Sequence, residues 1–194
     1  MNKPQNRTYM KKTAFFVAVF GLMGAVSLEA QELIPYLKGD KWGFCTPDKK
    51  VMIQPKYEWA NVFREGLAEV KLNGKWGFID QTGREVVPPK YDWVEYPREG
   101  LAEVKLNGKW GLIDKTGREI VPPKYDKVWF FSEGLAEVEL KGKCGFIDKT
   151  GREVVPPKYD DARSFSEGLA AVKRNGKWGF IDQTGREVVP PKYD

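Results

Sequence analysis

The chain repeats itself every 34 residues, and this period constrains the fold more than any other feature of the sequence. Residues 73–92, NGKWGFIDQTGREVVPPKYD, recur without a change at residues 175–194. Two near-copies lie between them and a more divergent copy precedes them, so the unit occurs five times. A fixed period of this length is typical of an array in which each unit packs on its neighbours.

The sequence of each unit indicates short β-strands. In residues 67–80, LAEVKLNGKWGFID, Asn-Gly separates two runs of alternating apolar and polar residues, and this arrangement is the strongest short signal for a hairpin. The alternation places Ala68 on one side of the first strand and Glu69 on the other. Three Gly-containing pairs within eleven residues are incompatible with a helix. The helical arrays that share the 34-residue period are therefore excluded.

A second turn and a third strand complete the unit. In residues 80–83, DQTG, we expect the Asp carboxylate to accept backbone N–H bonds and Gly83 to adopt a positive φ. The third strand, residues 84–87, is expected to end at Pro88-Pro89, because proline has no N–H donor for a sheet interior. An eight-residue connector, such as residues 93–100, leads to the next copy.

These elements predict an all-β fold: a tandem array of five 34-residue, three-stranded antiparallel units in an open, superhelical, solenoid-like stack. The alternative is a propeller-like ring, whose blades usually hold four strands and about 40 residues or more. The repeat region is expected to span residues 31–194, with units that start near residues 33, 67, 101, 135 and 169.

Residues 1–30 carry the pattern of a secretory signal peptide. Basic residues precede a nearly apolar run at residues 14–26, and small residues follow in SLEAQE. This is the order of n-region, h-region and cleavage site. A membrane span is the rival interpretation, but the run is shorter than the about 20 apolar residues that a span needs. We therefore expect an exported protein, in the periplasm, at the cell surface or outside the cell, with no membrane span after cleavage. Either Met1 or Met10 can be the start of the translated chain.

Charge and composition exclude several kinds of partner. Four of the 32 basic and one of the 27 acidic residues lie in the first thirty, which leaves 28 and 26, a net charge of +2. A charge that small does not support nucleic-acid binding, which needs a dense basic face. The chain has no histidine, so it lacks both the commonest general base and the commonest metal ligand.

A longer pattern links the units to a known family. Residues 63–92 and 165–194 read F-x-E-G-L-A-x-V, then G-K-W-G-F-I-D-x-T-G, then P-K-Y-D. With this pattern the chain resembles the WG-repeat (KWG) family of bacterial proteins from Leu33 onward. The resemblance implies a tandem β-repeat protein that is often exported, and it implies no catalytic residue. The first unit departs most, with Pro35 at the position of Glu69, which suits a capping unit.

No residue stands out as catalytic or metal-binding, and no cofactor is expected. The recurring acids, such as Asp80 and Glu85, have structural uses as a turn cap or a solvent-facing strand residue, and five equivalent catalytic sites in one array would be unusual. The DxTG turn offers one carboxylate, too few for a calcium cage. Cys45 and Cys144 replace apolar residues of other copies, so we expect two buried free thiols.

The aromatic residues divide into two groups. Those that recur at fixed offsets are expected to form the structural core of the repeats: Trp42, Trp76, Trp110, Trp178, Tyr91, Tyr125 and Tyr159. Those in the connectors, where the copies differ, are the candidate ligand-binding residues: Trp59, Trp93 and Trp129. For this second group a packing role is the equal alternative.

Three functional hypotheses follow. The leading one is an exported, non-enzymatic scaffold that presents its repeats to a protein partner or serves as a structural element. The second is a module that binds a cell-wall or other cell-envelope glycan through aromatic residues between repeats. The third, an enzyme, requires carboxylates clustered in a cleft that breaks the repeat symmetry.

Overall fold

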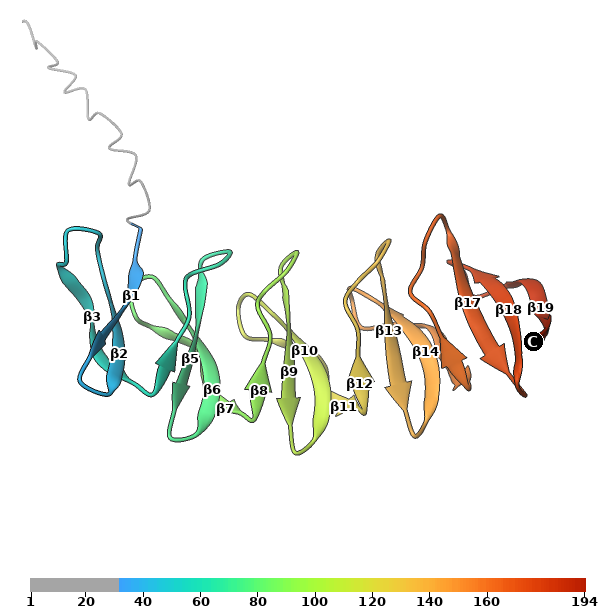
Figure 1. Cartoon of the computed structure of the whole chain (residues 1–194), viewed down its shortest axis with the longest axis horizontal. Helices are drawn as coiled ribbons and strands as arrows, with labels where there is room; N and C mark the ends of the chain where they lie inside the picture. Colours follow the sequence, from blue (N-terminus) through green and yellow to red (C-terminus); the bar gives the residue numbers. More distant parts are fainter. Residues whose placement is uncertain (1–31) are drawn as a thin grey trace, which may run out of the picture. The chain divides into compact units, whose positions relative to one another are not determined.

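The computed structural model describes residues 32–194, so the predicted signal peptide at residues 1–30 and the start of the repeat region at residue 31 lie outside the described residues. Within residues 32–194, 19 strands form five antiparallel sheets and no helix occurs. Figure 1 shows the sheets following one another as an open row. The predicted all-β array of five antiparallel units is confirmed.

The strands fall into the sheets in sequence order. The first sheet contains β1 (Ile34–Lys38), β2 (Lys41–Cys45) and β3 (Val51–Tyr57). The second contains β4 (Trp59–Ala60), β5 (Leu67–Leu72), β6 (Lys75–Asp80) and β7 (Glu85–Tyr91). The third contains β8 (Trp93–Val94), β9 (Leu101–Leu106), β10 (Lys109–Asp114) and β11 (Glu119–Tyr125). The fourth contains β12 (Lys127–Val128), β13 (Leu135–Leu140), β14 (Lys143–Asp148) and β15 (Glu153–Tyr159). The fifth contains β16 (Asp161–Ala162), β17 (Leu169–Arg174), β18 (Lys177–Asp182) and β19 (Glu187–Tyr193).

Four of the sheets have one strand more than the sequence predicts. The three expected strands of each unit are present, and the connector before them adds a two-residue strand at the edge, as β4 does beside β5. Trp59 pairs with Lys71 and Ala60 with Val70. The connector is therefore part of the sheet, and its side chains are held at the sheet edge.

The prediction that the third strand ends at Pro88-Pro89 is wrong, because β7 continues through both prolines to Tyr91. β7 is an edge strand, and its register against β6 shifts between the Trp76–Tyr91 and Phe78–Val87 pairs. A bulge at a sheet edge tolerates residues without an N–H donor. Across the bulge lies the glycine of the Trp-Gly pair: a Cβ at Gly77 would lie 2.3 Å from the Val87 carbonyl oxygen.

Both predicted turns are confirmed. At the β5–β6 turn Asn73 and Gly74 have φ of 51° and 75°, as the tight hairpin turn requires. At the β6–β7 turn the Thr82 N–H donates to Asp80 Oδ1 at 2.9 Å, and Gly83 has φ of 84°. The Asp80 carboxylate thus stabilises the β6–β7 turn, as the sequence predicts.

Each of the first four sheets buries one face on the sheet that follows it. Phe78, Val87 and Tyr91 of the second sheet share a buried cluster with Val104 and Ile113 of the third. Corresponding clusters join the first sheet to the second, the third to the fourth and the fourth to the fifth. The hydrophobic core is therefore a series of interfaces between consecutive sheets, and no sheet buries its apolar residues alone.

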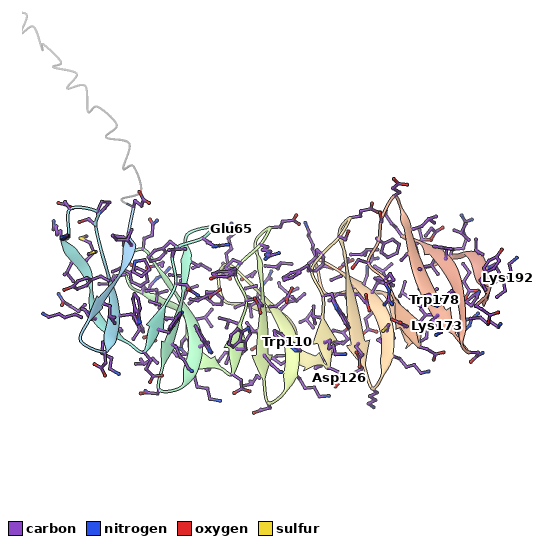
Figure 2. All side chains as sticks on the ribbon, viewed as in Figure 1. Glu65, Trp110, Asp126, Lys173, Trp178 and Lys192 are labelled. Carbon is purple, nitrogen blue, oxygen red and sulfur yellow. The ribbon has the colours of Figure 1, made fainter. Side chains whose placement is uncertain are left out.

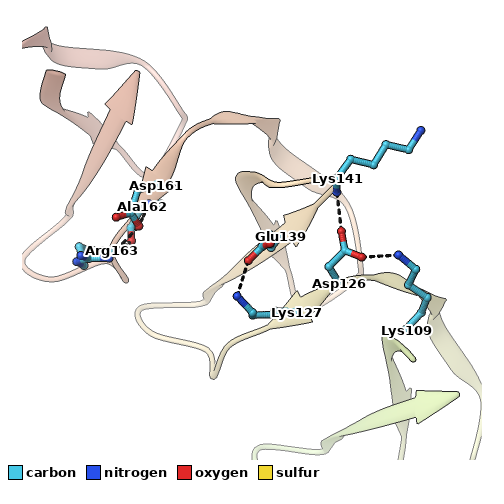
Figure 3. Close-up of polar contacts among 8 residues, drawn as sticks. All are labelled: Lys109, Asp126, Lys127, Glu139, Lys141, Asp161, Ala162 and Arg163. Atoms are coloured by element: carbon cyan, nitrogen blue, oxygen red, sulfur yellow. Dashed lines mark hydrogen bonds and ion pairs between the residues drawn. The ribbon is translucent and has the colours of Figure 1, made fainter. Parts of the chain in front are cut away.

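Polar side chains also join consecutive repeats. The Tyr91 hydroxyl donates to Glu119 Oε1 in the next sheet at 3.0 Å. At one edge of the row, Asp126 pairs with Lys109 and accepts the backbone N–H of Lys141 at 2.6 Å (Figure 3). The carboxylate of Glu65, labelled in Figure 2, accepts the N–H groups of Glu99 and Gly100, 34 and 35 residues later, both at 3.0 Å. The recurring polar residues thus fix the spacing of the sheets.

Candidate functional site

The connectors line grooves on the surface between consecutive sheets. We call residues 59–66, 93–100, 127–134 and 161–168 the connectors. One groove, which we call the Trp59–Tyr96 groove, lies between the second and third sheets and has a volume of about 420 Å³. Its lining residues are Trp59, Asn61, Glu69, Trp76, Trp93, Val94, Glu95 and Tyr96.

Aromatic rings form much of the Trp59–Tyr96 groove. Trp59 and Trp93 are 48% and 45% exposed, which is unusual for side chains of this size. The ring of Trp93 stands edge-on to that of Trp76, with centroids 5.5 Å apart. The Trp93 indole N–H donates to Glu95 Oε1 at 2.8 Å, which orients both side chains. The groove therefore offers exposed π-surfaces held in defined positions.

Glu69 is the least satisfied polar group of the groove. Its side chain is 5% exposed, and Oε2 accepts the Asn61 amide N–H at 2.7 Å. Its other oxygen, Oε1, is buried and receives no hydrogen bond from any residue in the range 32–194. Burial, with the charge of the nearby Glu95 adding to it, raises the pKa of Glu69 to about 7, although the hydrogen bond from Asn61 lowers it in part. Such a group is costly for the fold unless something else satisfies it.

A second carboxylate, the half-buried Glu103, lies close by in the third sheet. Burial raises the pKa of Glu103 to about 7, and the charge of Glu95 adds to the effect. Arg64 lowers the pKa of Glu69 in part, and Arg98 does the same for Glu103. The Arg64 guanidinium lies 4.2 Å from the centroid of the Tyr96 ring. The charge of Glu95 thus disfavours the ionisation of two neighbouring carboxylates.

The equivalent groove between the fourth and fifth sheets has different chemistry. It has a volume of about 380 Å³ and includes Lys127, Trp129, Glu137, Cys144 and Arg163. At the four equivalent connector positions the chain has Asn61, Glu95, Trp129 and Arg163. One structural position therefore carries an amide, an acid, an aromatic ring and a base in successive repeats.

The structure brings two of the three candidate ligand-binding residues together. Trp59 and Trp93 line the same groove, whereas Trp129 lines the groove between the fourth and fifth sheets. Trp129 is half-buried, and Lys127 Nζ lies 5.5 Å from its ring centroid. The candidate list did not include Asn61, Glu69, Glu95 or Tyr96. Differences between copies could have identified Asn61, Glu95 and Tyr96, because these residues lie in connectors, but could not have identified Glu69.

The expected core aromatics occupy two environments. Tyr91, Tyr125 and Tyr159 are fully buried between sheets. The four tryptophans are only partly buried: Trp42, Trp76, Trp110 and Trp178. Lys105 Nζ lies 5.3 Å from the ring centroid of Trp110, and Lys173 Nζ lies 5.6 Å from that of Trp178. Trp110, Lys173 and Trp178 are labelled in Figure 2. Their lysine partners show that these rings accept cations on their faces.

Both cysteines are buried free thiols, as expected. Cys144 takes the place that tryptophan holds in the other repeats and lines the groove between the fourth and fifth sheets. Burial, with the charge of Glu137 adding to it, raises the pKa of Cys144 to about 12, so its thiol is un-ionised at neutral pH.

The outer face of the fifth sheet is a second unusual surface. Phe180 and Tyr193 are 40% and 54% exposed, whereas the identical residues of the second sheet, Phe78 and Tyr91, are fully buried. Within residues 32–194 no further sheet packs on this face. The described part of the chain also holds no cluster of three or more metal-binding side chains and no helix suited to crossing a membrane.

Fold and grooves define a class: an all-β tandem-repeat protein with surface grooves between its units. A model of the WG containing repeat matches residues 42–76, 76–110, 110–144, 145–178 and 178–194. The chain belongs to the family of proteins with this repeat. No curated protein matches the chain.

Comparison with solved structures finds weak likenesses. Hsv2p of Kluyveromyces lactis is 13% identical, with 81% of this chain and 59% of that chain covered and a TM-score of 0.44. A structure titled for the de novo evolutionary emergence of a symmetrical protein is 9% identical, with coverage of 78% and 86% and a TM-score of 0.29. The chain spans about three fifths of the length of the Hsv2 structures.

Proposed function

We propose that the chain is an exported, non-enzymatic scaffold that binds a protein partner through the grooves beside its connectors. One observation carries the proposal: residues that fold the unit recur, while residues that line equivalent grooves differ. A surface whose chemistry changes from repeat to repeat, on a frame that does not change, is typical of binding by a repeat array.

The hydrogen bonds that the recurring carboxylates accept within the fold support a non-enzymatic role. Asp80 accepts the N–H groups of Thr82 and Arg84, at 2.9 and 3.1 Å, within its own turn. Glu119 and Glu153 accept the hydroxyls of Tyr91 and Tyr125 from the preceding sheet, at 3.0 and 2.8 Å. The hydrogen bonds that these carboxylates accept therefore stabilise the fold. Export rests on the pattern of residues 1–30, and fractionation of cells that express the tagged full chain tests it.

Cross-linking in the native host tests the partner. The full chain carries a C-terminal tag, and the double variant Trp59→Ala, Trp93→Ala is compared with Met52→Ala. Met52 is 44% exposed and lies outside the Trp59–Tyr96 groove, so it is a matched surface change. We expect a cross-linked protein that persists in Met52→Ala and is lost in the double variant. Identical cross-linked proteins in all three would refute binding at the groove.

A glycan-binding module is the second candidate, favoured by the exposed rings of Trp59 and Trp93 beside the Asn61 amide. Sugars stack on such rings and exchange hydrogen bonds with amides and carboxylates. This candidate predicts that the chain is retained on peptidoglycan or polysaccharide and that Trp59→Ala, Trp93→Ala abolishes retention. Absence of retention in the wild-type chain would remove it.

A further inference from the structure

The chemistry of the Trp59–Tyr96 groove narrows what it can bind. Glu69 is buried, with 5% of its surface exposed. Its Oε1 atom accepts no hydrogen bond from any residue in the range 32–194. The groove that it lines is open to solvent beside the exposed rings of Trp59 and Trp93. A buried acceptor of this kind calls for a donor that the described chain does not supply.

We propose that the Trp59–Tyr96 groove binds a primary alkylammonium group, namely the lysine side chain of a protein partner. The inference rests on the proposed function, because it names the group by which that partner is recognised. The ammonium donates to Glu69 Oε1, its charge lies between Glu69 and Glu95, and its methylene chain packs on the indole rings.

Charge distinguishes an ammonium from a neutral sugar. Glu69 and Glu95 both line the groove, and the charge of Glu95 adds to the burial that raises the pKa of Glu69, so the two carboxylates repel one another when ionised. A cation relieves that repulsion, whereas a sugar hydroxyl supplies only a hydrogen bond. Within residues 32–194 no lysine or arginine hydrogen-bonds Glu69 Oε1: Arg64, which lowers the pKa of Glu69 in part, lies over the ring of Tyr96, and Lys71 Nζ lies 5.6 Å from the ring centroid of Trp76.

The number of donors distinguishes a primary from a quaternary ammonium. Glu69 Oε1 needs an N–H donor, and a primary ammonium carries three. A quaternary ammonium can lie against the tryptophans but leaves the carboxylate oxygen without a hydrogen bond. The buried acceptor therefore disfavours the quaternary form.

The groove between the fourth and fifth sheets supplies an internal control. Glu137 occupies the position of Glu69 and is 6% exposed. Its groove, however, is lined by Lys127 and Arg163, whereas no lysine or arginine lines the Trp59–Tyr96 groove. Burial raises the pKa of Glu137 to about 6, and Arg163 lowers it in part. Because the chain supplies its own cations here, we expect no binding of a partner lysine in the equivalent groove.

The test titrates the full chain with n-butylammonium at constant ionic strength and follows the indole N–H signals of Trp59 and Trp93 by NMR. We expect a saturable shift of both signals. Glu69→Gln should raise Kd at least about tenfold, which corresponds to ~1.4 kcal/mol, and Glu137→Gln should leave Kd unchanged. Glu95→Gln, a partly exposed residue, gives a second variant with weaker binding that does not alter a buried position.

Three further probes identify the group. Butan-1-ol lacks the charge and tetramethylammonium lacks the N–H donors, so both should bind at least about tenfold more weakly than n-butylammonium. The peptide acetyl-Gly-Lys-Gly-amide should bind at least as tightly, whereas a peptide that fails to bind would overturn the lysine assignment in favour of a free amine. Equal binding of butan-1-ol, tighter binding of N-acetylglucosamine, or equal losses in Glu69→Gln and Glu137→Gln would each overturn the inference.

Failure of this inference is distinguishable from failure of the proposed function. If n-butylammonium does not bind while Trp59→Ala, Trp93→Ala still abolishes cross-linking to the partner, the scaffold proposal stands and the ammonium assignment is wrong. If the amine binds but the double variant keeps every cross-linked protein, the groove is an amine site that the partner does not use.

Discussion

The glycine of each Trp-Gly pair should be among the residues least tolerant of change, and Gly77→Ala tests this directly. A Cβ at Gly77 would lie 2.3 Å from the Val87 carbonyl oxygen and 2.8 Å from the Pro89 nitrogen, both in the backbone of β7. Contacts this short cannot persist, so β7 must move away from β6. That movement disturbs the Trp76–Tyr91 pair and the hydrogen bond from Tyr91 to Glu119.

The magnitude follows from the contacts that are lost. Overpacking against a backbone that cannot yield costs ~1–3 kcal/mol, and loss of the Tyr91 hydrogen bond adds ~1 kcal/mol. The smaller conformational freedom of unfolded alanine returns ~0.4–1 kcal/mol. We therefore expect Gly77→Ala to lower the free energy of unfolding of the full chain by ~1–3.5 kcal/mol in urea denaturation.

Gly74→Ala is the matched control. Gly74 has a positive φ of 75°, but a Cβ there meets no atom within 4 Å. Its substitution carries only the conformational cost of ~1–2 kcal/mol for a left-handed residue. Gly77 has no positive φ, so its cost is steric. A loss below ~1 kcal/mol for Gly77→Ala would refute the assignment of this glycine to the close approach of β6 and β7.

Two further predictions concern packing and charge. Phe78→Ala should destabilise the chain by ~3–5 kcal/mol and Phe180→Ala by much less, because the first ring is buried between sheets and the second is 40% exposed; similar losses in urea denaturation would contradict the difference in stacking. Burial raises the pKa of Glu69 from 4.5 to about 7 in the folded chain; Glu95 adds to this effect, and Asn61 and Arg64 oppose it. Because the folded pKa lies above the unfolded one, the stability that protonated Glu69 contributes is present below about pH 4.5 and is lost as the pH rises through 7. Glu69→Gln should therefore raise the free energy of unfolding at pH 8 by up to ~3 kcal/mol and leave it unchanged near pH 4.5; a wild-type stability that does not fall between these pH values would count against a buried, uncompensated carboxylate.

The repeat period and the turn residues were sufficient to predict the frame. Asn73 and Gly74 need a positive φ, and Asp80 has a side chain that can close the next turn, so local chemistry determines both turns. Stacking followed because a small sheet cannot bury enough apolar surface alone. These inferences use residues whose behaviour depends on near neighbours in the sequence.

The sequence-based predictions were wrong or incomplete where the neighbouring strands of the sheet determine the local structure. Pro88 and Pro89 continue β7 because the strand is at an edge and bulged there, and neither condition is visible in a run of four residues. β4 is two residues long, too short for any periodicity. Glu69 alternates with apolar neighbours and reads as solvent-facing, but it is buried in a groove lined by the following connector.

The candidate site was predicted in part for the same reason. Trp59 and Trp93 were identified because connectors differ between copies, and the structure places them in one groove. Trp76 recurs in most copies and was assigned to the core, yet it is partly exposed in that groove. A recurring residue can serve both the fold and a groove, and sequence repetition does not separate the two roles.

The central claim is that recurring residues build the array and connector residues choose the ligand. The most direct test replaces residues 59–66, WANVFREG, by the sequence of residues 127–134, KVWFFSEG, in the full chain, and measures n-butylammonium binding together with urea denaturation. The account predicts a cooperative unfolding transition like that of the wild-type chain and a Kd raised by at least about tenfold. An exchanged chain that no longer folds, or one that folds and binds the amine as the wild-type chain does, would contradict it.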